Sequence, residues 1–175
     1  MKTLTKEMQA AITPTIALDL LKEGNKRFIN NLKINRNLLQ QANETSEGQH
    51  PFAVILSCID SRTSAELIFD QGLGDIFSVR IAGNIINEDI LGSMEFGCKV
   101  AGAKIIVVLG HTKCGAVKGA CDHVEMGNLT GVLAKILPAV NDEQKIKENR
   151  TASNPEFVES VAELNVKRTV KSITE

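Results

Sequence analysis

Short apolar runs alternate with amphipathic stretches along the chain. Three runs, 52–57, 76–82 and 104–110, have the length and composition of strands buried on both faces of a parallel sheet. Helical spacing of apolar residues around them predicts helices over about 14–31, 36–46, 63–71, 89–101, 128–140 and 155–171, and a short helix within 111–122. This alternation of strands and helices favours an α/β fold with a mainly parallel sheet and right-handed crossovers.

Polar residues mark where several of these helices begin. Thr13 precedes Pro14, as a cap does when proline occupies the first helical turn, and Asn128 precedes an apolar stretch. Thr63 and Glu66 have the spacing of a capping box. The polar segment 141–154 is expected to be an excursion over the surface.

The length of 175 residues predicts a single domain, because two ordinary domains need a longer chain. We divide it into an N-terminal helical arm (1–50), a core that carries the candidate site (51–127) and C-terminal helices (128–175).

No apolar run approaches the roughly 20 residues of a membrane-spanning helix, and no signal-peptide pattern is present, so we expect a cytoplasmic protein without a membrane partner. The net charge of −1 includes no basic block, which argues against nucleic acid.

Metal-binding side chains follow two of the expected strands. Cys58 ends the first strand, His111 follows the third, and Cys114 comes three residues later at the start of a short helix. If these two strands are neighbours, the three side chains converge, because ligands bind at the carboxyl ends of parallel strands. Two thiolates and an imidazole are ligands that zinc prefers, and three protein ligands leave a position free for catalysis. The pattern therefore predicts a catalytic Zn²⁺ site.

The remaining cysteines and histidines fit other roles. Cys98 and Cys121 lie among apolar helix residues, where cysteine is usually part of the core. His123 follows in a polar stretch and is expected at the surface, and His50 before Pro51 is expected in a loop.

Asp60 and Arg62 lie on the turn that leaves the Cys58 strand. As an ordinary surface ion pair they would carry no function. Beside a metal, an aspartate held by a guanidinium keeps its charge and orientation. Such an acid either becomes the fourth zinc ligand or accepts a hydrogen bond from a zinc-bound hydroxide.

Four motifs follow one another along the chain: CIDSR (58–62), RIAGN (80–84), GSMEF (92–96) and HTKCG (111–115). Together they resemble the β-class carbonic anhydrases over about residues 14–140. The resemblance implies reversible hydration of carbon dioxide to bicarbonate and a proton, through attack by zinc-bound hydroxide. It implies that Cys58, His111 and Cys114 are the zinc ligands and that Asp60 and Arg62 form a catalytic pair beside the fourth position.

The same resemblance implies a three-layer fold with strand order 2-1-3-4, homodimers or larger homo-oligomers, and N-terminal helices that wrap a partner subunit. Gly83 and Asn84 are expected at the pocket rim. Arg80 aligns with an arginine that binds bicarbonate in regulated members, although the tryptophan and tyrosine that accompany it there are absent from this sequence.

The C-terminus departs from the family pattern. Members continue after the last helix with two further strands, whereas this sequence ends at VKRTVKSITE, so the expected strand order is 2-1-3 with further strands missing or replaced. The apolar third strand is then an exposed edge unless a partner or the 128–171 helices cover it.

Two alternatives to carbonic anhydrase activity remain. One is a related hydrolase that acts on carbon disulfide or carbonyl sulfide. The other is a zinc-stabilised module without activity, in which Asp60, Cys121 or His123 completes four protein ligands.

Overall fold

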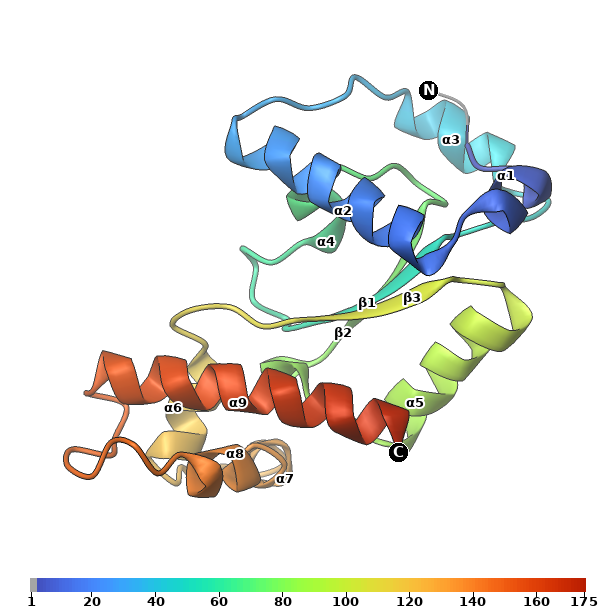
Figure 1. Cartoon of the computed structure of the whole chain (residues 1–175). Helices are drawn as coiled ribbons and strands as arrows, with labels where there is room; N and C mark the ends of the chain where they lie inside the picture. Colours follow the sequence, from blue (N-terminus) through green and yellow to red (C-terminus); the bar gives the residue numbers. More distant parts are fainter. Residues whose placement is uncertain (1–2) are drawn as a thin grey trace. The chain divides into compact units, whose positions relative to one another are not determined.

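The computed structural model describes residues 3–175 and contains a three-stranded sheet with the order β2-β1-β3 (Figure 1). The strands are β1 (Ala53–Ser57), β2 (Ile76–Arg80) and β3 (Ile105–Leu109). Where the strands begin, the Phe52 N–H donates to the Asp75 carbonyl, and the Phe52 carbonyl accepts from the Lys104 N–H. Where β1 ends, the Ser57 carbonyl accepts from the Ile81 N–H. Strand starts thus pair with strand starts, which confirms the predicted parallel sheet and its order 2-1-3.

The central strand β1 and the edge strand β3 differ in burial, as their positions in the sheet require. All five residues of the central strand β1 are buried, whereas all five of β3 are half-buried. β3 is an edge of the sheet within residues 3–175, as the sequence led us to expect.

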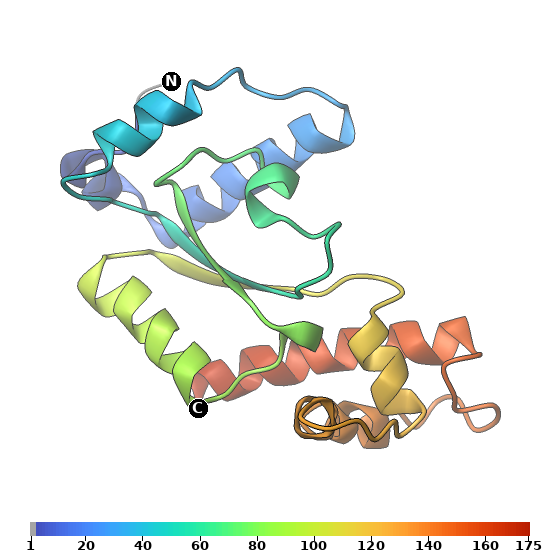
Figure 2. The ribbon, with the colours of Figure 1, turned by 180° about the vertical axis from the view of Figure 1, so that it is seen from behind.

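The chain forms two compact units that interleave along the sequence. The first comprises 1–56, 61–79 and 88–107, of which residues 1–2 lie outside the described part. It contains most of the sheet together with α1 (Lys6–Ala11), α2 (Pro14–Ile29), α3 (Leu38–Glu44), α4 (Ala65–Ile68), α5 (Glu88–Glu95) and the π-helix η2 (Phe96–Val100). Within this unit α2 and α4 pack together on one side of the strands (Figures 1 and 2). The Thr13 side chain accepts from the Ile16 N–H, which confirms the predicted start of α2.

The second unit comprises 57–60, 80–87 and 108–175. Its helices are the 3₁₀ turn η1 (Ala82–Asn84), α6 (Gly115–Cys121), α7 (Leu129–Ala134), α8 (Leu137–Asp142) and α9 (Pro155–Thr174). α9 packs against α6 and α8 (Figure 1). The core of the unit is apolar and includes Val117, Ile136, Phe157 and Val161.

Two helix boundaries differ from expectation. The helix expected over 63–71 is shorter: α4 spans Ala65–Ile68 with Ser64 as its N-cap, and the Glu66 side chain accepts hydrogen bonds from the hydroxyls of Ser64 and Ser78. The helix expected over 128–140 is two helices, α7 and α8. Pro138 has no N–H for the carbonyl of Ala134, so a continuous helix would lose that bond, and proline instead occupies the first turn of α8.

The segment 141–154 is anchored more firmly than a surface excursion. The Glu143 side chain is only 1% exposed and accepts from the backbone N–H groups of Lys145 and Ile146 and from Arg150. The Arg150 guanidinium also stacks 4.6 Å from the centre of the Phe157 ring. This charged cluster fixes the segment to α8 and α9. None of the described helices has the length and apolar character to cross a membrane.

Candidate metal centre

Cys58, His111 and Cys114 converge in the second compact unit, where the ends of two neighbouring strands meet. Cys58 directly follows β1, His111 lies two residues after β3, and Cys114 is the N-cap of α6. Their candidate ligand atoms all lie within 4.8 Å of one another. Within residues 3–175 this is the one group of at least three Cys, His, Asp or Glu side chains that offers such a cluster.

The spacing of the two thiols fits a shared zinc ion. Cys58 Sγ and Cys114 Sγ are 4.0 Å apart, and neither cysteine is in a disulfide. Two sulfur atoms about 2.3 Å from a tetrahedral zinc are roughly 3.8 Å from each other. The side chains are 4% and 2% exposed, so the sulfurs already lie together in a largely dry site.

His111 offers a nitrogen lone pair to the same point. Its Nδ1 lies 2.9 Å from the carbonyl oxygen of Thr112, which can only accept, so the proton resides on Nδ1. Its Nε2 is buried and has no hydrogen-bond partner among the described residues. An unpaired buried nitrogen is costly unless something binds it. A metal ion satisfies it, and the Thr112 carbonyl orients the ring as the outer partner of a metal-bound histidine does.

Cys114 is held at the start of α6. Burial raises the pKa of its thiol, and the nearby Cys58 sulfur adds to that effect, whereas the backbone N–H groups of Val117 and Ala116 lower the pKa. A bound cation reverses this balance, because a coordinating thiol loses its proton outright. The preceding Lys113 adopts a left-handed φ of 56°, and its N–H donates to Glu159 of α9, which secures the turn that carries His111 and Cys114.

Three hydrogen bonds from Gly83 and Arg80 support Cys58 and the turn that follows it. The Gly83 N–H donates to Cys58 Sγ at 3.3 Å, and Arg80 donates to the carbonyls of Cys58 (3.0 Å) and Asp60 (2.7 Å). Sequence reasoning considered Arg80 only as a bicarbonate ligand and missed this contact. Its place at the end of β2, beside the end of β1, is the signal that could have suggested it.

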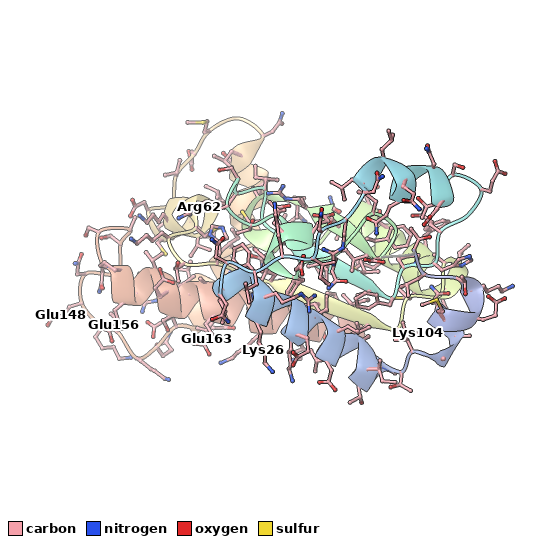
Figure 3. The ribbon with its side chains drawn as sticks, turned by 90° about the horizontal axis from the view of Figure 1, so that it is seen from above. Lys26, Arg62, Lys104, Glu148, Glu156 and Glu163 are labelled. Carbon is pink, nitrogen blue, oxygen red and sulfur yellow. The ribbon has the colours of Figure 1, made fainter. Side chains whose placement is uncertain are left out.

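The acid expected beside the metal, Asp60, lies near the imidazole of His111. The Asp60 side chain is 21% exposed, and its Oδ2 is 3.9 Å from His111 Nδ1, which is too long for a hydrogen bond. Arg62 is exposed on the loop between β1 and α4 and belongs to the first compact unit (Figure 3).

The other thiols and imidazoles do not join the cluster. Cys121 is buried in the apolar core of the second unit, as predicted, and burial raises the pKa of its thiol to about 11. Cys98, expected in the core, is only half-buried, whereas His123 is exposed, as predicted. His50 is half-buried in the loop before β1.

Comparisons with known proteins agree with this geometry. Residues 53–175 match the family model described as carbonic anhydrase. Carbonic anhydrase 2 of Mycobacterium tuberculosis is 43% identical over 133 residues, which cover 73% of this chain and 64% of that protein. The chain belongs to the β-class carbonic anhydrase family. Zinc is the cofactor of this family, and the Cys58–His111–Cys114 cluster could hold it.

Solved β-carbonic anhydrases share the fold. The enzyme CafA of Aspergillus fumigatus has a TM-score of 0.68 at 29% identity, covering 91% of this chain and 74% of its own. One of two tetrameric β-carbonic anhydrases of Sordaria macrospora has a TM-score of 0.70 at 22% identity, covering 92% and 79%. The chain spans less than two thirds of the length of the curated relatives from Mycobacterium tuberculosis (64%) and Mycolicibacterium smegmatis (65%).

Proposed function

We propose that this β-carbonic anhydrase chain catalyses the zinc-dependent, reversible hydration of carbon dioxide to bicarbonate and a proton. The observation that carries the proposal is the convergence of two buried sulfurs and one unpaired imidazole nitrogen within 4.8 Å. Family membership supports the reaction, since the matching family model and the curated relative are both described as carbonic anhydrase.

Cys58 Sγ, Cys114 Sγ and His111 Nε2 are the proposed zinc ligands. Three protein ligands leave one coordination position for the reaction. Zinc held by these three ligands would act as a Lewis acid, which makes water a better acid and nucleophile near neutral pH. Within residues 3–175 no fourth cysteine or histidine reaches the cluster, which favours an open catalytic site over a closed structural one.

Asp60 is the proposed orienting acid. A carboxylate in its position, beside the imidazole, accepts a hydrogen bond from the attacking water and aims an oxygen lone pair at carbon dioxide. Arg62 is proposed to keep Asp60 ionised by its positive charge. Arg80 is proposed to hold Asp60 in position, because its hydrogen bonds to two carbonyls fix the backbone between Cys58 and Asp60.

Stopped-flow hydration of carbon dioxide with a pH indicator tests the proposal. We expect activity in the zinc-loaded chain and nearly complete loss in Cys58→Ser and His111→Ala. Cys98→Ser is the matched control, since this thiol lies outside the cluster. A parallel assay with carbon disulfide and carbonyl sulfide identifies the substrate. Full carbon dioxide hydration by Cys58→Ser would refute the site, and hydrolysis of only the sulfur substrates would refute the proposed reaction.

We also propose a cytoplasmic homo-oligomer, a homodimer or larger. All four cysteines are free thiols, as is usual in a reducing compartment. Large apolar side chains remain exposed on α2 and η2, including Ile16, Phe28, Phe96 and Val100, and a partner subunit would remove them from water. Native mass spectrometry of the full chain should give two or more chains per particle. A particle with a single chain at micromolar concentration contradicts this assembly.

A further inference from the structure

An asparagine is buried in the middle of the apolar face of α9. Asn165 is 3% exposed, and its Nδ2 donates to the carbonyl oxygen of Gly83 at 2.8 Å. Burying an amide is costly unless it is paired, so an apolar residue would ordinarily serve better at this position. The pairing places the middle of α9 against η1, and both views show these two elements side by side (Figures 1 and 2).

Gly83 links this asparagine to the metal centre. Its N–H donates to Cys58 Sγ, while its carbonyl accepts from Asn165. Gly83 has a φ of 69°, and a Cβ there would lie 2.6 Å from Ile136 Cδ1, so any other residue would be strained in this turn. Glycine also has the greatest backbone freedom, so the orientation of its N–H depends on the contacts that hold the turn.

Other contacts at the turn are weaker or more local. The Asn84 N–H closes the 3₁₀ turn on the Ile81 carbonyl at 3.0 Å. Thr169, one turn further along α9, donates to the Asn84 carbonyl at 3.4 Å, near the limit for a hydrogen bond. Of the two side-chain hydrogen bonds from α9 to η1, the one from Asn165 is the shorter.

We propose that Asn165 is a positioning residue for the Cys58 thiolate. By holding the Gly83 carbonyl, it keeps the Gly83 N–H directed at Cys58 Sγ, where the hydrogen bond stabilises negative charge and orients the sulfur lone pairs. This inference rests on the proposed function in one respect, that Cys58 is a metal ligand. Outer-shell hydrogen bonds of this kind change metal affinity by about 10–100-fold.

Cobalt titration tests the role of Asn165. In Asn165→Leu, a residue of similar size without a donor, we expect the affinity for Co²⁺ to fall about tenfold, at the lower end of that range. We also expect the sulfur-to-cobalt charge-transfer band to move to longer wavelength, because a sulfur without its hydrogen bond gives up an electron more readily. Asn165→Ala, which adds no bulk, should show the same two changes.

The controls separate a positioning role from a packing role. Thr169→Val removes the weaker bond of α9 and should leave the band in place. If the Asn165 variants only lower Tm, while affinity and band match the parent, the positioning role is wrong. If Cys58→Ser keeps the complete two-thiolate band, the ligand set itself is wrong and the inference falls with it. A shifted band together with weaker binding in both Asn165 variants supports the proposal.

Discussion

Oδ2 of Asp60 lies 3.9 Å from Nδ1 of the His111 imidazole. A carboxylate there acts by accepting a hydrogen bond, and an amide of equal size offers a donor in place of one acceptor oxygen. We therefore expect the aspartate to affect water orientation more than metal binding.

Asp60→Asn should retain one zinc per chain and lose about 100-fold or more of the carbon dioxide hydration rate, the scale of a single positioned acid or base. Metal analysis and stopped-flow hydration on the same sample measure both quantities. Loss of zinc from this variant would indicate that Asp60 is a ligand. An unchanged rate with full zinc would remove its orienting role.

Gly83 and Gly131 provide a matched pair of glycine substitutions in the second unit. Gly83→Ala forces an L residue into a φ of 69° and against Ile136, so we expect the free energy of unfolding to fall by about 1–3 kcal/mol. Gly131 lies in α7 with open space around its Cα, and Gly131→Ala should raise that free energy by about 0.5–1 kcal/mol. Urea unfolding measures both, and effects of the same sign would contradict the conformational argument.

Residue chemistry made the Cys58–His111–Cys114 cluster predictable, but not the contacts that support it. Cys58, His111 and Cys114 are rare ligand types at strand and helix ends, so their pattern is visible in the sequence. Arg80 and Asn165 act on carbonyl oxygens, which every residue carries. Nothing in the local sequence specifies which carbonyl such a side chain meets, and only the packing of η1 and α9 determines it.

At the scale of elements, apolar periodicity predicted the strands and most helices, and local chemistry decided the differences. Pro138 divides the helix expected over 128–140 because it lacks a backbone donor. α2 has the expected helical spacing, yet Ile16, Leu20 and Phe28 are 40–47% exposed. Periodicity shows which residues share a face and leaves open what covers that face.

The segment between α8 and α9 has an acid-sensitive anchor. Burial on its own raises the pKa of Glu143, but the hydrogen bonds from Lys145, Ile146 and Arg150 outweigh it and hold that pKa below its ordinary value of 4.5. A carboxyl whose pKa is lower in the folded chain adds stability above the unfolded value. That stability is lost as the pH falls through the folded value.

Arg150→Met removes the charged partner and should lower Tm, with the largest difference from the parent above about pH 5 and a shrinking difference below 4.5. Thermal unfolding followed by circular dichroism at several pH values measures it. Arg168→Met is the matched control, because its ion pair with Asp142 is 47% exposed on both sides and should contribute less. Equal, pH-independent shifts in both variants would argue against the anchor.

At the scale of the whole molecule, the candidate metal centre belongs to one of two interleaved units. Its ligands lie in 57–60 and 108–175, and the chain between Cys58 and His111 contributes 61–79 and 88–107 to the other unit. An ion that joins Cys58 to the other two ligands therefore closes a long loop of the chain. A ligand that binds the folded chain and not the unfolded chain stabilises the folded state by mass action.

Zinc at 100 times its dissociation constant should stabilise the parent by about 2.7 kcal/mol, which corresponds to a rise in Tm of roughly 5–11 °C for a chain of this size. Amide hydrogen exchange should show the gain in protection first in 80–87 and α6, which adjoin the ligands, and least in α2 of the other unit. Cys98→Ser should keep the full shift, and His111→Ala should lose most of it. Because zinc favours the folded chain only through ligands assembled there, an equal shift in His111→Ala would place the stabilising ion elsewhere.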